Sequence, residues 1–126
     1  MSRILHTPAA PAAIGPYSQA VATGKLVFTS GQLGIDPTTG ELAQGVERQT
    51  TLALQNLGAI LKQAGLGYEH IVKTTVFVTD MADFAAVNAV YAGFFANGCP
   101  ARSCVQVAAL PKGGLVEIEA VAAEKE

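Results

Sequence analysis

Apolar residues follow two kinds of spacing along this chain. In some segments every second residue is apolar, which is typical of a half-buried strand, and in others apolar residues recur every three or four positions, which is typical of an amphipathic helix. Residues 46–64 show the helical spacing, with Glu47 in the first turn, Lys62 in the last and Gly65 as a natural stop. This segment is therefore predicted to be a helix.

A second helix is expected after Asp80 and Asp83, which resemble an N-terminal cap. Its apolar stripe consists of Phe84, Val87, Tyr91, Phe94 and Phe95. Asn88 lies on the same stripe, where a buried amide must find hydrogen-bond partners or cost about 1–3 kcal/mol. Two interpretations of Asn88 stay open: a structural bond to a neighbouring loop, or a role near a pocket.

Strands are expected on either side of these helices, at residues 4–5, 17–22, 25–32 and 71–79 and in two segments between Pro100 and Val121. Gly31 interrupts the third strand and predicts a bulge or a close backbone approach by a ligand or partner. In the fourth strand Val72, Val76 and Val78 are assigned to one face, opposite Lys73, Thr75 and Thr79.

The order of these elements predicts an α+β domain that spans residues 1–126 as a single unit. Its core would be a six-stranded mixed, mostly antiparallel sheet with two helices on one face. The other face, rich in Thr, Glu and Arg, is left for subunit contact or solvent.

Residues 100–121, PARSCVQVAALPKGGLVEIEAV, combine two predicted strands with charged side chains. Arg102 and Cys104 share one face of the first strand, and Glu117 and Glu119 share one face of the second, because side chains two apart point the same way. Charged residues are rarely fully buried unless paired. We therefore expect these groups on the polar face of the sheet, where the simplest alternative is that they are only solvated.

Composition narrows the classes of partner. Hydrophobic residues make up 50% of the 126 positions and charged residues only 14%, against about 25% charged in an ordinary domain. So few charges predict that part of the surface is buried against other copies of the chain. The formal charge of −2 argues against nucleic-acid binding, and no apolar run approaches the roughly 18 residues of a membrane-spanning helix.

The N-terminal residues break into Pro8 and Pro11 without an apolar signal-peptide core, which predicts a cytoplasmic chain. Cys99 and Cys104 are the only cysteines, and they lack the further Cys or His residues of a zinc site. Free thiols and no metal are therefore expected. Tyr17 follows the rigid Gly15-Pro16 pair, and it is either an edge residue or a hydroxyl presented to a pocket.

Several segments together resemble the RidA (YjgF) family of reactive-intermediate deaminases. They are residues 10–20 (APAAIGPYSQA), 28–32 (FTSGQ), 71–78 (IVKTTVFV), 100–105 (PARSCV), 110–112 (LPK) and 116–120 (VEIEA), together with Asp83-Phe84 and Val87-Asn88. The resemblance covers nearly the whole chain, and the spacing from Pro-Ala-Arg-Ser to Glu-Ile-Glu is its most specific part.

The resemblance implies a chorismate-mutase-like homotrimer with clefts between subunits. It also implies hydrolysis of 2-imino acids or their enamine tautomers, such as 2-iminobutanoate and 2-iminopropanoate, which pyridoxal-phosphate-dependent dehydratases release. The products are 2-oxo acids and ammonia, and no metal or organic cofactor is expected.

By the same resemblance, Arg102 and Glu117 are the catalytic residues: Arg102 grips the substrate carboxylate, and Glu117 handles water and protons. Tyr17, Ser30, Gly31, Asn88 and Cys104 are carried over as residues that line or close the cleft. A guanidinium binds a carboxylate through two parallel hydrogen bonds, and a nearby cationic Arg102 would favour ionisation of Glu117.

Three features depart from the family pattern: the short connection at residues 96–99, Gln106 in place of an acidic residue, and Gly113-Gly114 in the last turn. They bear on substrate breadth and the pocket rim. Two other functions remain as alternatives: a module that binds small metabolites in the same clefts without turnover, and RNA cleavage, which the acidic charge disfavours.

Overall fold

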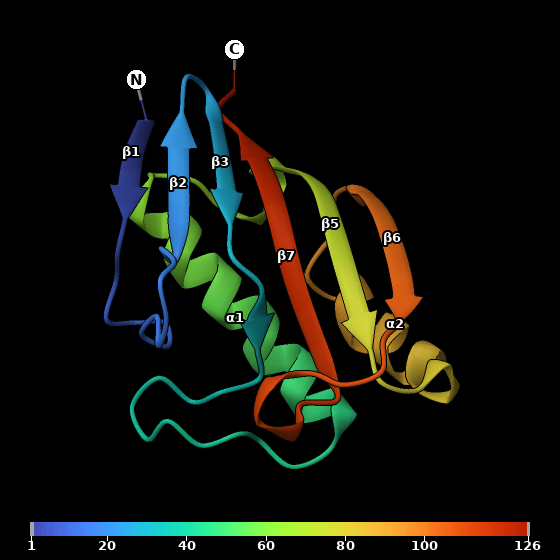
Figure 1. Cartoon of the computed structure of the whole chain (residues 1–126). Coiled ribbons are helices and arrows are strands. Elements are labelled where there is room, and N and C mark those ends of the chain that lie inside the picture. The colour runs from blue at the N-terminus through green and yellow to red at the C-terminus, as the bar shows by residue number, and fades with distance from the viewer. Residues whose placement is uncertain (1, 126) are drawn as a thin grey trace.

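A computed structural model describes residues 2–125, which form one curved sheet with helices packed on one side (Figure 1). The strands are β1 (Ser2–Leu5), β2 (Ala20–Thr23), β3 (Leu26–Thr29), β4 (Gln32–Leu33), β5 (Ile71–Val78), β6 (Ala101–Gln106) and β7 (Val116–Ala123). The helices are α1 (Val46–Gln63) and α2 (Phe84–Ala92), with short 3₁₀ turns at Tyr68–His70, Met81–Asp83 and Pro111–Gly113.

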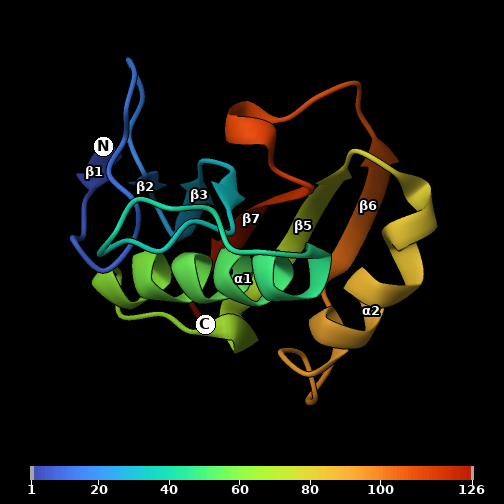
Figure 2. The same ribbon diagram turned by 90° about the horizontal axis from the view of Figure 1, so that it is seen from below.

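The strand order is β1-β2-β3-β7-β5-β6, and β4 also pairs with β7. Neighbouring strands are antiparallel except β5 and β6, which are parallel and joined through α2, as a parallel pair requires a crossover. Viewed from below, α1 and α2 lie on the same side of the sheet (Figure 2). The mixed, mostly antiparallel sheet with two helices on one face confirms the predicted fold class.

The segment predicted as one strand at residues 25–32 is two strands, because the chain departs from regular pairing at Ser30 and Gly31. Both β3 and β4 pair with β7 on the same side. Between them the Ser30 N–H donates to the carbonyl of Gln19 rather than to β7. The interruption predicted from Gly31 is confirmed, and it opens the sheet beside the middle of β7.

Helix α1 ends within a residue of its predicted boundary and supplies several of the largest fully buried side chains of the core. Its buried face includes Leu54, Leu57, Ile60 and Leu61, which belong to a cluster with buried residues from β2, β3, β5 and β7. The prediction for Val72 is wrong. A register shift between Ile71 and Lys73 reverses the alternation there, so that Ile71 is buried and Val72 is 49% exposed.

The turn before α2 is capped from two sides. The Asp80 carboxylate accepts from the Ala82 N–H, and the Gln106 amide oxygen accepts from the Met81 N–H at 2.8 Å. Gln106 thus supplies an acceptor oxygen that an acidic residue would also supply. Among residues 2–125 no helix has the length and apolar character needed to cross a membrane.

Candidate active site

Arg102 lies on the helix-facing side of the sheet. In the register of the parallel pair it is opposite Thr74 of β5, and Thr74 is fully buried beneath the helices. Side chains opposite one another on paired strands share a face. The expectation that Arg102 occupies the open, polar face is therefore wrong: β6 is an edge strand, so its inner face meets α2 and keeps access to solvent.

The guanidinium of Arg102 is held by α2. Its Nη1 donates to Oδ1 of Asn88 at 2.8 Å. The guanidinium carbon lies 4.8 Å from the ring centroid of Tyr91 and 5.5 Å from that of Phe84, distances at which a cation is attracted to a ring face. Within residues 2–125 no carboxylate forms an ion pair with Arg102. The arginine is oriented, and its charge is not neutralised.

We call Arg102, Asn88, Tyr91, Phe84 and Cys104 the arginine cluster. The Tyr91 hydroxyl is 2.7 Å from the hydroxyl of Thr74, which fixes the ring beneath the guanidinium. Burial raises the pKa of the Cys104 thiol, although Arg102 acts in the opposite direction. The raised pKa favours the neutral thiol of Cys104 over a thiolate nucleophile.

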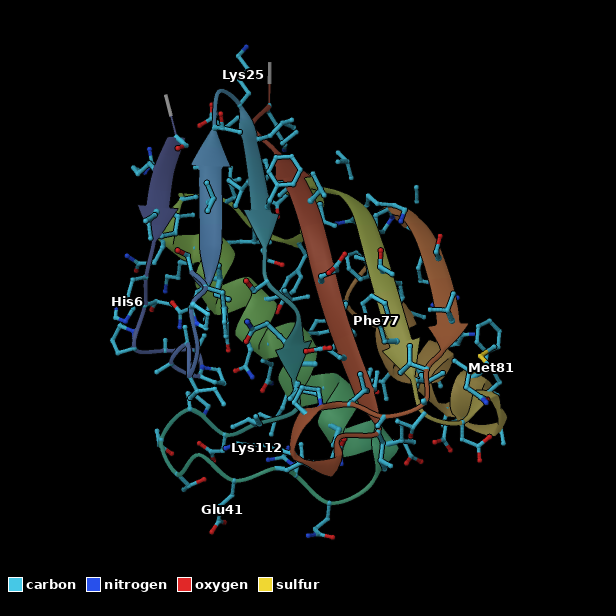
Figure 3. The ribbon with its side chains drawn as sticks, in the orientation of Figure 1. His6, Lys25, Glu41, Phe77, Met81 and Lys112 are labelled. Atoms are coloured by element: carbon cyan, nitrogen blue, oxygen red, sulfur yellow. The ribbon has the colours of Figure 1, made fainter. Side chains whose placement is uncertain are left out.

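Glu117 points to the opposite face. Its neighbours along β7, Val116 and Ile118, are buried toward the helices, so Glu117 faces away from them. It is opposite Phe77 of β5 (Figure 3) and Leu33 of β4. Within one chain, Glu117 and Arg102 therefore lie on different sides of the sheet.

The surroundings of Glu117 favour its protonated form. Burial raises the pKa of Glu117, and the neighbouring Glu119 carboxylate raises it further. The expectation that Arg102 would promote ionisation of Glu117 is wrong within one chain. A carboxyl whose pKa is shifted toward neutrality is suited to transferring protons at physiological pH.

Gly31 makes room for this carboxyl group. A Cβ atom at Gly31 would lie 2.8 Å from Cδ and 2.9 Å from Oε2 of Glu117, closer than non-bonded atoms approach. The interruption between β3 and β4 thus exists where the Glu117 side chain crosses the sheet surface. The close approach predicted at Gly31 is made by a side chain of the same molecule.

Glu117 lines a cavity of about 390 Å³, which we call the glutamate cavity. Its wall is built from Pro11, Ala12, Ile14, Tyr17, Gly31, Gln32, Leu33, Ile35, Asp36, Pro37, Gly40, Pro111, Lys112 and Glu117. Tyr17 is half-exposed at this wall. Ser30 is not part of this lining, and its hydroxyl donates to the carbonyl of Ser18 at 2.6 Å.

Buried amides hold the walls of the glutamate cavity, and the sequence interpretation missed them. Gln19 is 3% exposed, accepts from the N–H of Thr7 and donates to the carbonyls of Thr7, Ala10 and Pro11. It therefore fixes the proline-rich segment that forms one wall. Its position directly before β2 gave no signal that its side chain turns inward.

Two amides from α1 also bond to main-chain groups, Asn56 at two lining residues of this cavity and Gln49 at segments outside its lining. Asn56 donates to the carbonyls of Leu33 and Ile35. Gln49 donates to the carbonyl of Ala43 and accepts from the N–H of Leu115 at 2.8 Å. Both lie among the apolar positions of the helix, and this mismatch is the sequence signal that could have identified them.

The residues predicted to form one site are thus brought together in two groups. Arg102, Asn88 and Cys104 meet beside α2, while Tyr17, Gly31 and Glu117 meet at the glutamate cavity on the other side. Among residues 2–125 no three His, Cys, Asp or Glu side chains are placed to hold a metal ion.

Comparison with known proteins relates this arrangement to a family. The model of the family described as endoribonuclease L-PSP matches residues 7–124. A protein of Capra hircus named 2-iminobutanoate/2-iminopropanoate deaminase is 54% identical over 123 residues, which cover 97% of this chain and 90% of that protein.

Two solved structures agree closely with this chain. E. coli TdcF with bound serine has a TM-score of 0.95 and 50% identity, covering 98% of this chain and 99% of its own. The YjgF gene product of E. coli has a TM-score of 0.94 and 50% identity with the same coverage. The arginine cluster and the glutamate cavity therefore sit on a fold shared over its full length.

Proposed function

Because the chain belongs to the RidA (YjgF) family, we propose that it hydrolyses reactive 2-imino acids and their enamine tautomers to 2-oxo acids and ammonia. The substrates are 2-iminobutanoate and 2-iminopropanoate, the compounds in the name of the Capra hircus relative. They are formed by pyridoxal-phosphate-dependent dehydratases acting on threonine and serine.

The observation that carries this proposal is the fixed orientation and unpaired charge of the Arg102 guanidinium. Its guanidinium is oriented by Asn88 and Tyr91 and has no carboxylate partner within residues 2–125. Arg102 is half-buried, so its unpaired charge is partly desolvated at a cost, and a substrate carboxylate would offset that cost through two parallel hydrogen bonds. All of the proposed substrates carry such a carboxylate next to the reacting carbon.

Glu117 supplies the proton transfers. As a carboxylate it takes a proton from water while the oxygen attacks the imine carbon, and it then gives that proton to the nitrogen. The carboxylate then takes the proton of the new hydroxyl group and passes it to the same nitrogen, so that the carbon–nitrogen bond breaks, ammonia leaves and the carbonyl forms. One correctly positioned acid–base group contributes about 10²–10⁴-fold to such a reaction, and the raised pKa of Glu117 favours both steps near neutral pH.

A complete site requires a second copy of the chain, because Arg102 and Glu117 lie on opposite faces of one sheet. We place the cleft where the arginine cluster of one subunit meets the glutamate cavity of the next, in a homotrimer. The open sheet face supports association, since the large apolar residues Ile4, Phe28 and Val105 are exposed there. The low charge content agrees with such burial.

Activity is tested by adding the protein to a threonine dehydratase reaction and following imine decay against an added trapping amine. Decay that is no faster with the protein than without it would disprove the deaminase function. Arg102→Ala is expected to lower kcat/KM at least tenfold, since a charge-assisted hydrogen bond contributes about 1.5–3 kcal/mol.

The shared cleft is tested by subunit mixing. Arg102→Ala and Glu117→Gln chains are each expected to be inactive. Random co-assembly of the two chains in equal amounts should restore about one cleft in four over all trimers, and one cleft in three within each mixed trimer, where an intact arginine meets an intact glutamate. Light scattering gives the mass of the assembly. A mixture as inactive as its parents would show that both residues act within one chain.

The second candidate is a module that binds small metabolites without turnover, which the serine bound to E. coli TdcF favours. In that case Arg102→Ala would weaken binding of 2-oxobutanoate, Glu117→Gln would bind normally, and no imine would be consumed. RNA cleavage, named in the family description, is disfavoured by the net charge of −2, and a direct RNA-binding titration checks it.

A further inference from the structure

Lys112 has an unusual backbone conformation. It is the non-glycine residue with positive φ among residues 2–125, at φ 58° and ψ 20°. Gly113 follows at φ 71°, and the Gly114 N–H closes the turn on the Pro111 carbonyl at 3.0 Å. Both central positions of such a turn favour Gly, Asn or Asp. A lysine there is held against its steric preference, and such strain often marks functional sites.

The segment that follows the turn fixes its position. The Leu115 N–H donates to the buried Gln49 side chain, and the Leu115 carbonyl accepts from the Thr79 N–H. A Cβ atom on Gly114 would lie 2.8 Å from the Leu33 side chain, so the turn packs directly against the wall of the glutamate cavity. Lys112 therefore projects from an anchored base.

The ammonium of Lys112 lies at the rim of the glutamate cavity. Its Nζ is 3.4 Å from the carbonyl oxygen of Gly40, another lining residue. This bond is long, and within residues 2–125 no carboxylate forms an ion pair with Lys112. Figure 3 shows Lys112 beside the loop that carries Glu41, at the opposite end of the molecule from Lys25.

The cavity has two other charged groups, Asp36 and Glu117. Oδ1 of Asp36 accepts from both the N–H and the hydroxyl of Thr38, and Glu117 lies against Gly31. Most of the remaining wall is apolar, including Ile14, Leu33, Ile35, Pro37 and Pro111. The cavity thus combines an acid–base group, an apolar wall that suits methylene groups, and an ammonium with free donors at its rim.

On the basis of the proposed function, we infer that Lys112 is a specificity-determining residue that extends the substrate range to 2-imino acids with a second carboxylate at the end of the side chain. The first carboxylate is bound by Arg102 of the neighbouring subunit and the reacting carbon lies at Glu117. The methylene groups then follow the apolar wall, and the distal carboxylate reaches the Lys112 ammonium.

The test compares two substrates of equal carbon number, 2-iminoglutarate and 2-iminopentanoate, formed by an amino acid oxidase from glutamate and norvaline. Lys112→Asn removes the charge and keeps a residue that tolerates positive φ, so the turn is preserved. The ratio of kcat/KM for the acidic over the neutral substrate is expected to fall about fivefold, the upper range for an exposed ion pair. Lys112→Arg should retain the wild-type ratio.

Lys25→Asn is the matched control, since Lys25 is an exposed lysine in the turn between β2 and β3. It should leave the ratio unchanged, and added salt should lower the ratio in the wild type but not in Lys112→Asn. An unchanged ratio in Lys112→Asn, or an equal fall in Lys25→Asn, would overturn the inference. If the wild type consumes neither of these imines but does consume 2-iminobutanoate, the deaminase function stands; if it does not consume 2-iminobutanoate either, that function fails. The Lys112 inference is then decided by calorimetry, which should show that Lys112→Asn weakens the binding of 2-oxoglutarate more than the binding of 2-oxopentanoate.

Discussion

The contact between Asn88 and Arg102 allows a test of whether the unpaired charge of Arg102 binds the substrate carboxylate. In Asn88→Asp an oxygen still accepts the hydrogen bond that Arg102 Nη1 donates to Asn88 Oδ1 at 2.8 Å, but the substitution adds a negative charge. The new carboxylate would satisfy the guanidinium that has no ion-pair partner within residues 2–125. A substrate carboxylate would then have to compete for a neutralised arginine.

The magnitude follows from the strength of a charge-assisted hydrogen bond, about 1.5–3 kcal/mol. Arg102 is only half-buried, so solvent screening places the effect at the lower end of this range. Since about 1.4 kcal/mol corresponds to a tenfold change in affinity, we expect Asn88→Asp to weaken binding of 2-oxobutanoate about tenfold. The loss should appear mainly in KM, because the Glu117 chemistry is untouched.

Calorimetric titration of 2-oxobutanoate and steady-state kinetics with 2-iminobutanoate measure this effect. Asn97→Asp is the control, because Asn97 is exposed beyond α2 and the substitution adds the same charge. Thermal unfolding checks that both variants are folded. Wild-type affinity in Asn88→Asp would refute the idea that an unpaired Arg102 binds the substrate carboxylate.

Three further predictions concern the glutamate cavity. Gly31→Ala places a methyl group against the flexible Glu117 carboxyl. We expect kcat to fall about a hundredfold while the unfolding temperature changes little, and a wild-type kcat would contradict this expectation. Glu119→Gln removes one cause of the raised Glu117 pKa. The acid limb of the pH profile of kcat/KM should therefore move to lower pH, and a move to higher pH would refute the conclusion that the Glu119 carboxylate raises the Glu117 pKa. Gln49→Leu leaves a main-chain N–H before β7 without its acceptor, so chemical denaturation should show a loss of about 1–3 kcal/mol in the free energy of unfolding. The exposed Gln55→Leu on the same helix should show no such loss.

Local patterns predicted the elements because their causes are local. The helix expected at residues 46–64 is observed at Val46–Gln63, and the strand expected at 71–79 is observed at Ile71–Val78. The spacing of apolar residues determines which side of each element can be buried. Val72 was misplaced because a register shift in the pairing with β7 depends on the partner strand as well as on the sequence of β5.

The candidate site was predicted in part. Arg102 does share a face with Cys104, and Glu117 with Glu119, as two-residue periodicity requires. The Ser30 hydroxyl donates to the carbonyl of Ser18, and the expectation that Ser30 lines a cleft between subunits stays a prediction. The buried amides Gln19, Gln49 and Asn56 were not anticipated, because the carbonyls that accept their hydrogen bonds belong to other segments of the chain.

The sequence by itself therefore determined the secondary-structure elements, the pairs of side chains that share one face of a strand, and the family to which the chain belongs. Only the tertiary structure decided that Arg102 and Glu117 face opposite ways. Periodicity relates side chains within one strand, whereas the face that a strand turns toward a helix depends on its register with its neighbours. Here β6 places Arg102 over the aromatic rings of α2, while β7 buries Val116 and Ile118 and so directs Glu117 outward.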